Sequence, residues 1–278
     1  KQKTAYEIMP SLVGSEMCIR DSLYAPAYKK EQFTELLKYA DHVVFNSFKQ
    51  YYQFREQVRS SNRSPGIRIN PCHREVKIEK YDPCAPKSRL GVIPEEFANK
   101  DLSGIEGLHF HTLCECGAEA LQRTLAVVQE KFGRYFKGLK WVNFGGGHLI
   151  TKEDYNRDLL CDLVRSFSDR YGVQVYLEPG EAVVLGAGVL VAQVLDIVQN
   201  QGLIAILDTS AASHMPDVLE MPYKPKVRGA FDPGIAPYTY RLAGLTCLAG
   251  DVIGDYSFPS PLKIGAVSYT HLTLPTKA

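Results

Sequence analysis

The chain has 278 residues, of which 45% are hydrophobic and 23% are charged, and its formal net charge is +1. This composition is typical of a globular protein with one large or two ordinary domains, and the balanced charge excludes a whole-protein field that would attract nucleic acid or an anionic membrane. No apolar run reaches the roughly 18 residues that span a bilayer and no secretory leader stands at the start, so we expect a cytoplasmic protein.

Both ends of the chain carry a sequence that we interpret as foreign to the protein. Met17 to Ser22 and Val267 to His271 can be encoded by reverse-complementary strings, which resemble the transposon end used in making sequencing libraries. A complementary tag at both ends makes chance the weaker explanation. We therefore expect residues 1–22 and 266–278 to be a translated sequencing-tag artefact, and we leave both out of the predicted fold.

Between these ends, short apolar runs alternate with amphipathic stretches, which is the pattern of β-α units around a parallel sheet. The predicted strands are Asp41 to Asn46, Gly66 to Asn70, Gly107 to His111, Lys140 to Phe144 and Val173 to Leu177. The predicted helices are Lys49 to Val58, Gly117 to Phe136 and Lys152 to Tyr171. The order predicts an α/β fold, a TIM-type (β/α)8 barrel. A complete barrel has about eight strands, so we expect about three to be missing upstream of Leu23.

After Pro179 the pattern changes. Gly188 to Val198 and Leu203 to Asp208 read as strands with no helix between them, and Pro and Gly become frequent. This pattern of strands and turn residues indicates a second, mostly β domain. We therefore assign residues 23–185 to a partial barrel and residues 186–265 to an incomplete C-terminal β domain.

Three predicted strands break off at residues that suit one phosphate-bearing ring cofactor. These residues are His111, then Gly145-Gly146-Gly147, then Glu178-Pro179-Gly180. Because the carboxyl ends of parallel strands in a barrel meet at the end that carries the active site, the series implies one site.

The glycines and the glutamate each suit a part of such a cofactor. Glycines at 145–147 let backbone N–H groups approach a phosphate, and a helix expected to begin near Thr151 adds a favourable dipole. The Glu178 carboxylate can keep a ring nitrogen protonated, which makes the pyridine of pyridoxal phosphate a better electron sink. Taken alone, the glycines suit a tight turn and Glu178 a surface turn, so their convergence carries the interpretation.

Strand alternation puts His109 and His111 on one face of their strand. They can ligate a metal together with Cys114 and Cys116, stack on a flat cofactor, or be satisfied core histidines. Metal-dependent hydrolases on this barrel need further His and Asp ligands at later strand ends, where this chain has glycines and Glu178. The metal alternative is therefore weaker, but it stays open. The seven cysteines include no Cys-x-x-Cys pair, so we expect reduced thiols.

Taken together, these segments resemble the fold type III pyridoxal-phosphate decarboxylases, and within them the branch that acts on carboxynorspermidine and carboxyspermidine. Ornithine decarboxylases carry Arg where Glu181 stands, which favours this branch. The resemblance covers nearly everything from Tyr24 to Gly265. The matching segments are Phe110 to Glu115, Asn143 to His148, Glu178 to Glu181, Leu207 to Asp217 and Cys247 to Asp251.

The resemblance implies a pyridoxal 5'-phosphate-dependent carboxy-lyase of polyamine biosynthesis that makes norspermidine or spermidine as a homodimer with shared active sites. It implies that His111 stacks on the pyridine ring and that Glu178 bonds the ring nitrogen. It also implies that Cys247 crosses the dimer interface to protonate the carbanion left by CO₂ loss. The phosphate would be held by Gly145, Gly146, Gly147 and Gly180, and the substrate's ammonium groups by Glu115, Asp217 and Asp251.

Two of these residues also have ordinary structural explanations. Cys247 can be a small buried hydrophobe, and Asp217 can be a turn or helix-cap residue. Diaminopimelate decarboxylase and a metal-dependent barrel hydrolase that uses His109 and His111 are the alternative functions.

The chain departs from the family where the lysine that forms the Schiff base is expected. In the family this lysine lies on the first barrel strand, which the predicted fold lacks. Lys1 and Lys3 fall in or beside the suspected tag, and Lys29 and Lys30 follow no predicted apolar strand. We therefore assign none of them to catalysis, and we expect this chain, as written, to be inactive although its parent is a decarboxylase.

Overall fold

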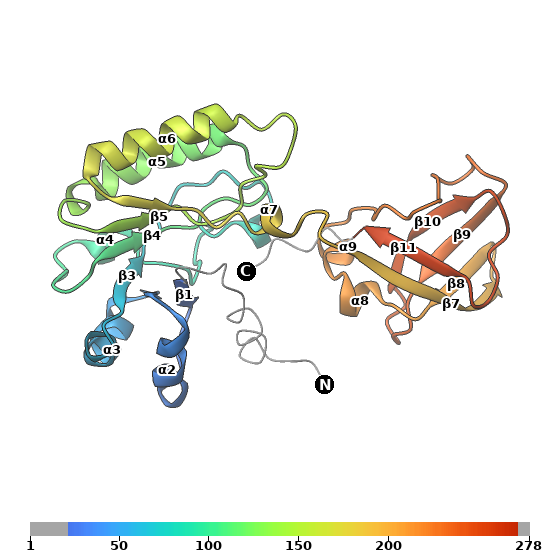
Figure 1. Cartoon of the computed structure of the whole chain (residues 1–278), viewed down its shortest axis with the longest axis horizontal. Helices are drawn as coiled ribbons and strands as arrows, with labels where there is room; N and C mark the ends of the chain where they lie inside the picture. The colour runs from blue at the N-terminus through green and yellow to red at the C-terminus, as the bar shows by residue number, and fades with distance from the viewer. Residues whose placement is uncertain (1–21, 272–278) are drawn as a thin grey trace. The chain divides into compact units, whose positions relative to one another are not determined.

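The computed structural model describes residues 22–271, which divide into two compact units, with the boundary in the chain between Pro179 and Gly180 (Figure 1). Lys1, Lys3, most of the N-terminal tag and residues 272–278 lie outside the described residues. Within the described part of the chain, none of the helices combines the length and the apolar character that crossing a bilayer requires.

Unit 1 is built on a six-stranded parallel sheet whose strands follow one another in chain order. The strands are β1 (Ser22–Ala25), β2 (His42–Phe45), β3 (Ser64–Arg68), β4 (Gly107–His109), β5 (Trp141–Asn143) and β6 (Gln174–Tyr176). The five predicted strands and the partial barrel are confirmed.

Strand β1 is a sixth strand that we did not predict. It is only four residues long and begins at Ser22, inside the segment interpreted as a tag. The expectation that no apolar strand precedes Lys29 and Lys30 is therefore wrong, and Lys30 opens a helix. Four residues are too few to give a strand signal by alternation, so pairing with β2 decides this element.

Helices lie between the strands. They are α2 (Lys30–Leu36), α3 (Phe48–Ser60), α4 (Pro94–Phe97), α5 (Ala118–Phe132) and α6 (Arg157–Tyr171), with short 3₁₀ turns η1 (Leu37–Tyr39), η2 (Glu79–Tyr81) and η3 (Gly133–Tyr135). Helices α3, α5 and α6 correspond to the three predicted helices, whereas α2 and α4 were not predicted. The expected start of the last helix near Thr151 is wrong. The Asn156 side chain accepts a hydrogen bond from the Leu159 amide at 3.0 Å, and this cap makes the helix begin at Arg157.

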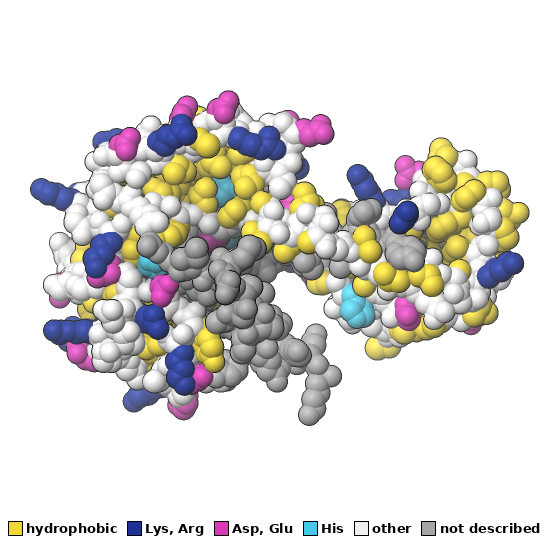
Figure 2. Space-filling model, viewed as in Figure 1, with side chains coloured by type: hydrophobic (Ala, Val, Ile, Leu, Met, Phe, Trp, Pro, Cys, Tyr) yellow, Lys and Arg dark blue, Asp and Glu magenta, His cyan; other side chains and the backbone are white. Residues whose placement is uncertain are grey.

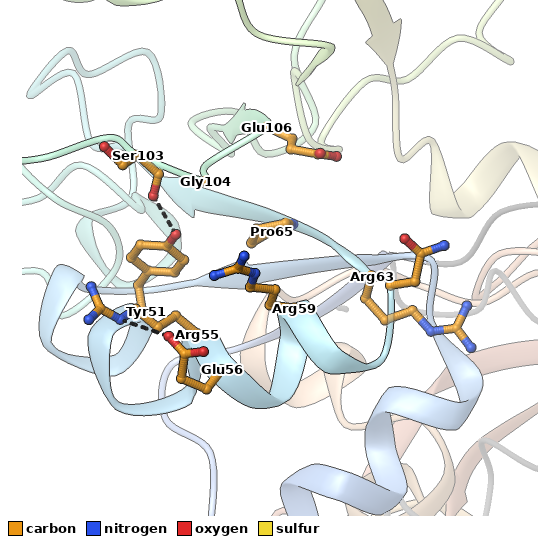
Figure 3. A pocket seen from close by; sticks show the side chains of 10 residues that line it. Tyr51, Arg55, Glu56, Arg59, Arg63, Pro65, Ser103, Gly104 and Glu106 are labelled. Carbon is orange, nitrogen blue, oxygen red and sulfur yellow. Dashed lines mark hydrogen bonds and ion pairs between the residues drawn. The ribbon is translucent and has the colours of Figure 1, made fainter.

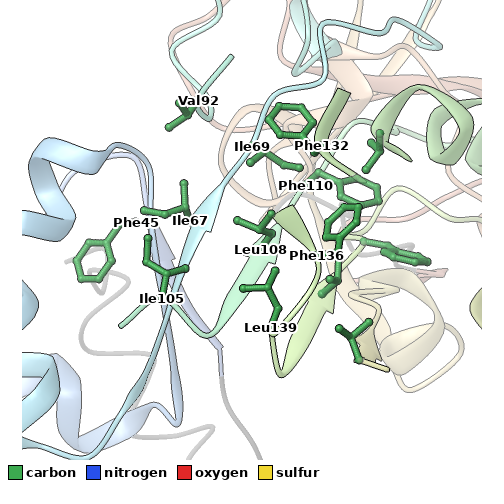
Figure 4. Packing of buried hydrophobic residues seen from close by; sticks show 14 of the residues in the cluster. Phe45, Ile67, Ile69, Val92, Ile105, Leu108, Phe110, Phe132, Phe136 and Leu139 are labelled. Atoms are coloured by element: carbon green, nitrogen blue, oxygen red, sulfur yellow. The ribbon is translucent and has the colours of Figure 1, made fainter. Parts of the chain in front are cut away.

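The core of unit 1 lies between the sheet and its helices (Figure 4). Ile67, Leu108 and Val142 point to this side from three neighbouring strands, and all are fully buried. Residues that alternate with them face the other way. There a Cβ at Gly107 would lie 2.1 Å from the indole of Trp141, so the glycine makes room for that ring. Alternation thus separates an apolar packing face from a face that carries aromatic and polar groups.

Unit 2 is a five-stranded sheet with the order β10-β9-β8-β7-β11, antiparallel except for the β8–β9 pair. This confirms the mostly β second region. Its elements are α7 (Gly180–Val184), β7 (Val189–Gln199), β8 (Leu203–Leu207), α8 (Ala211–His214), α9 (Asp217–Glu220), β9 (Tyr238–Ala243), β10 (Val252–Phe258) and β11 (Val267–His271).

Strand β11 lies in the stretch that we interpreted as a C-terminal tag. Its backbone pairs with β7 from Val267 opposite Gln193 to His271 opposite Val189. Leaving this stretch out of the fold was therefore wrong. A run of β-branched and aromatic residues favours a strand whatever the origin of its codons.

A cavity of about 520 Å³ lies between α3 and the amino ends of β3 and β4 (Figure 3). Arg55, Arg59 and Arg63 line it together with Tyr51 and Glu106. None of the predicted site residues is among its lining residues. The candidate site lies at the other end of the same sheet.

Candidate active site

The carboxyl ends of the parallel strands bring a series of polar side chains together. Asn143 ends β5, His109 ends β4 and Arg68 ends β3, while Tyr24 lies on β1. Glu178 follows β6 two residues after its end. Because all six strands run in the same direction, these side chains share one end of the sheet.

Glu178 is the centre of this group. Its Oε1 accepts a hydrogen bond from the Asn143 amide at 2.8 Å. Its Oε2 lies 3.7 Å from Nε2 of His109 and 3.8 Å from Nδ1 of His111. Burial alone would raise the pKa of Glu178, but the two imidazoles and the amide outweigh it and hold that pKa well below its usual range. The Glu178 side chain is therefore an ionised carboxylate, which can accept a hydrogen bond from a protonated ring nitrogen.

The two histidines differ in their surroundings. The side chain of His109 is 2% exposed, and neither of its ring nitrogens has a hydrogen-bond partner in the described structure. Burial lowers the pKa of His109, so its ring is neutral. The side chain of His111 is 24% exposed, and its Nδ1 accepts a hydrogen bond from the Gly146 amide at 3.3 Å. His111 is thus the ring that a bound group can reach.

The glycine loop packs against the segments that follow β4 and β6, since a Cβ at Gly146 would lie 2.4 Å from the Glu178 carbonyl oxygen. A Cβ at Gly145 would lie 2.6 Å from the carbonyl oxygen of Phe110, and one at Gly147 would lie 2.1 Å from that of Leu113. Both glycines also have positive φ, at +73° and +82°. Larger residues would therefore push the loop away from the site.

The loop amides are not equally available to a phosphate. The Gly145 N–H donates to Oδ1 of Asn143 at 2.8 Å, and the Gly146 N–H donates to His111. Among residues 22–271, the N–H of Gly147 has no hydrogen-bond partner. Because α6 begins only at Arg157, no helix N-terminus follows the loop directly, contrary to expectation.

Several site residues were missed by sequence reasoning. Arg68 is 5% exposed, places its guanidinium 4.7 Å from the centre of the Tyr24 ring and donates to the His111 carbonyl at 3.2 Å. A charged residue inside a predicted buried strand was the signal that could have identified it.

His148 was also missed, although it follows the glycine loop directly. It is buried, its Nδ1 lies 3.3 Å from the Tyr155 hydroxyl, and its Nε2 has no partner among the described residues. Burial and the nearby His111 lower the pKa of His148 to about 4. His148 is therefore a buried, neutral imidazole directly after the glycine loop.

Two predicted residues lie in the loop between β9 and β10 of unit 2. Cys247 is exposed. Asp251 is 3% exposed, and its oxygens accept hydrogen bonds from the Ala212 amide and from both the amide and the hydroxyl of Thr246. Burial would raise the pKa of Asp251, but these hydrogen bonds hold it below its usual range. Asp251 therefore braces the loop that carries Cys247.

The other predicted residues are exposed or half-buried positions within their own units. Glu115 is exposed and has a positive φ of 54°. Asp217 is half-buried at the start of α9, and Gly180 is exposed at the start of α7. Their assigned roles stay predictions.

The site also contains a group that could hold a metal ion. Donor atoms of His109, His111 and Glu178 all lie within 4.8 Å of one another. Cys114 and Cys116, which we considered as ligands, do not belong to this group; Sγ of Cys116 contacts the Cys114 carbonyl at 3.2 Å instead.

Comparison with known proteins gives close relatives. The chain is 48% identical over 253 residues to the carboxynorspermidine/carboxyspermidine decarboxylase of Campylobacter jejuni, covering 87% of this chain and 66% of the relative. It is 40% identical over 245 residues to the carboxyaminopropylagmatine decarboxylase of Synechocystis, covering 87% and 63%. The chain thus spans slightly less than two thirds of the length of these relatives.

Solved structures give the same result for the fold. The crystal structure of carboxynorspermidine decarboxylase from Campylobacter jejuni, complexed with norspermidine, matches with a TM-score of 0.80 and 44% identity, covering 91% of this chain and 69% of that one. A diaminopimelate decarboxylase matches with a TM-score of 0.74 but 18% identity, covering 97% and 71%, which shows the fold alone. Residues 43–272 match the family described as pyridoxal-dependent decarboxylase, C-terminal sheet domain. The chain belongs to the pyridoxal-dependent decarboxylase family.

Proposed function

We propose that the protein to which this chain belongs removes CO₂ from carboxynorspermidine or carboxyspermidine, giving norspermidine or spermidine, with pyridoxal 5'-phosphate as cofactor. The observation that carries this proposal is the 48% identity to the Campylobacter jejuni relative of that name over 87% of the chain. A substrate-specific branch is supported because the matched diaminopimelate decarboxylase is only 18% identical.

The residues at the carboxyl ends of the strands fit the cofactor. When bound, pyridoxal phosphate supplies an electron sink for the pair of electrons left by CO₂ loss. Glu178, which is ionised, holds the proton of the ring nitrogen, and Asn143 keeps that carboxylate in place at 2.8 Å. His111 offers its accessible ring for stacking. The loop glycines lie too close to the Phe110 and Leu113 carbonyl oxygens for a side chain to fit. The Gly147 N–H has no hydrogen-bond partner among residues 22–271, so it can donate to a phosphate oxygen.

The residues assigned to substrate and proton transfer belong to the proposal as well. Cys247 returns a proton to the substrate carbon across a homodimer interface, and Asp251 positions its loop. Glu115 and Asp217 bind ammonium groups of the polyamine. Both oxygens of Asp251 already accept hydrogen bonds, so a substrate ammonium group would have to share them.

Carboxyaminopropylagmatine is a second candidate substrate. The relative named for it is 40% identical over a similar part of the chain. The matched segments are thus common to enzymes named for different substrates. Carboxynorspermidine and carboxyspermidine differ from each other by one methylene, which is worth only about 1–3 kcal/mol in a pocket.

The test compares this chain with a version extended upstream by its source coding sequence. Each is incubated with pyridoxal phosphate and, separately, with the three carboxylated polyamines and diaminopimelate, and CO₂ and the amine product are measured. We expect the extended version to act on carboxynorspermidine or carboxyspermidine and the present chain to be inactive. Turnover of carboxyaminopropylagmatine alone would establish the second candidate, and turnover of diaminopimelate alone would show that both are wrong.

The homodimer is tested on the same extended protein by sedimentation velocity. A dimer whose activity is restored by mixing an inactive Cys247→Ala protein with an inactive Glu178→Gln protein supports shared sites. An active monomer would contradict them. A cytoplasmic location stays a prediction.

A further inference from the structure

We propose that His109, His111 and Glu178 form a binding site for a divalent transition-metal ion of the zinc class, and that this ion and pyridoxal phosphate exclude each other. The metal site stands on geometry alone, whereas the exclusion rests on the proposed function.

The first argument is the arrangement of donors. One donor atom from each residue lies within 4.8 Å of the other two, so a single ion can contact all three after small side-chain movements. Two imidazoles and one carboxylate are the ligand set of zinc sites that keep a position open. Asn143 holds Oε1 of Glu178 and leaves Oε2 beside the imidazoles, at 3.7 and 3.8 Å. A hydrogen bond of this kind is what orients a ligating carboxylate.

The second argument is the unpartnered state of His109. The ring is 2% exposed. Oε2 of Glu178 lies 3.7 Å from its Nε2, which is beyond hydrogen-bond distance, and neither ring nitrogen has a hydrogen-bond partner within residues 22–271. Buried polar atoms are nearly always paired, so an imidazole without a partner in a polar site indicates that a ligand completes it. In the proposed function His109 has no contact with the cofactor, and a metal ion would give this ring its partner.

The exclusion follows because the two ligands need the same atoms. Glu178 cannot ligate a cation and hold the proton of a pyridinium nitrogen with the same Oε2. His111 cannot turn a ring nitrogen towards an ion and present its flat face to a pyridine ring. Metal binding would therefore block loading of the cofactor.

The positive charge of Arg68 disfavours a bound cation, so an Arg68 variant gives a further test of the metal site. Its guanidinium contacts the His111 carbonyl, and its positive charge acts on His109. Removing this charge should strengthen metal binding, because like charges repel across a partly buried site. We expect Arg68→Gln to bind the ion more tightly than the unaltered chain.

The closing experiment titrates the 278-residue chain, without pyridoxal phosphate, with Zn²⁺ by calorimetry and with Co²⁺ by visible absorption. We expect one equivalent to bind, and His109→Gln to weaken binding by at least about tenfold. His42→Gln is the matched control, because it removes a buried strand histidine at the amino end of the sheet. Binding that is the same in His109→Gln and unaltered chain would overturn the site.

A second measurement does not depend on a variant. Nitrogen NMR of the histidine side chains should show Zn²⁺ shifting the His109 and His111 signals while the His42 signal stays in place. If Zn²⁺ shifts neither of the first two, the site is wrong.

Competition then tests the exclusion. On the upstream-extended version we expect saturating Zn²⁺ to weaken pyridoxal phosphate binding at least about tenfold, and this zinc-dependent factor to be lost in His109→Gln when each protein is compared with itself with and without Zn²⁺. Independent binding of both ligands would overturn the exclusion. If the chain binds the metal as described but the upstream-extended version binds no cofactor, the metal site is supported and the proposed function fails.

Discussion

The two ends of the six-stranded sheet are built from similar residue types but are organised differently. At the amino ends, Glu106 accepts hydrogen bonds from Ser64 at 2.6 Å and from Lys140 at 2.5 Å, and the Trp141 indole donates to the same Ser64 hydroxyl at 2.8 Å. At the carboxyl ends, His109 has no hydrogen-bond partner among the described residues.

This difference separates stability from binding within one sheet. The amino-end network satisfies its own polar groups, so it holds strands together and has little left to offer a ligand. The carboxyl end keeps a carboxylate, the buried imidazole of His109 and a closely packed glycine loop in place because the surrounding packing fixes them. Barrel proteins carry their active sites at this end, since variable loops follow the strands there. Four predictions test the comparison.

The largest expected effect is on the glycine loop. Gly147→Ala should destabilise the chain by about 3 kcal/mol or more, because the new Cβ would lie 2.1 Å from the Leu113 carbonyl at a positive φ. Gly172→Ala is the control, since it also has positive φ but nothing lies within 4 Å of its Cβ. Urea unfolding measures both. Equal losses for the two variants would mean that the close packing of the loop contributes nothing.

The second prediction concerns pH. The pKa of His148 is lowered to about 4, so the unfolded chain binds this proton more readily than the folded one. Stability should therefore fall as pH drops from about 6.5 to 4, by up to about 3 kcal/mol from this residue. In His148→Gln the slope of unfolding free energy against pH should flatten over that range. An unchanged slope would show that His148 titrates normally.

The third prediction exchanges one carboxyl group at each end. Glu178→Gln should lower turnover of the upstream-extended protein by about 100-fold, because a neutral amide cannot hold the ring nitrogen's proton. Glu106→Gln should leave turnover alone and cost about 1 kcal/mol of unfolding free energy through its lost charged hydrogen bonds. Steady-state kinetics and urea unfolding of both variants check this. The comparison fails if Glu106→Gln impairs turnover as strongly as Glu178→Gln does.

The smallest expected effect concerns Asp251 in unit 2. Its carboxylate, like that of Glu106 at the amino ends of the sheet, accepts hydrogen bonds from within the protein. Asp251→Asn should cost about 1 kcal/mol and loosen the loop around Cys247, because an amide accepts fewer of the hydrogen bonds from Thr246 and Ala212. The rate at which a thiol reagent modifies Cys247 reports the loosening, with Cys161 as the exposed control. If neither rate changes, Asp251 does not position the loop.

The sequence by itself determined the local elements and the series of strand ends. Alternation and amphipathic spacing depend on near neighbours, so the five predicted strands, the helices between them and the change after Pro179 are readable without a structure. The glycine loop and Glu178 are also readable, because parallel strands must bring their ends together. The segments that resemble the pyridoxal-phosphate decarboxylases include these same strand ends.

Only the tertiary structure decided the rest. The short strands β1 and β11 exist because β2 and β7 offer edges to pair with, and the start of α6 depends on one cap at Asn156. His109 lies beside Glu178, although the two are far apart in the sequence, because of the register of β4, β5 and β6. Such contacts depend on pairing and packing between distant segments, which no local pattern encodes.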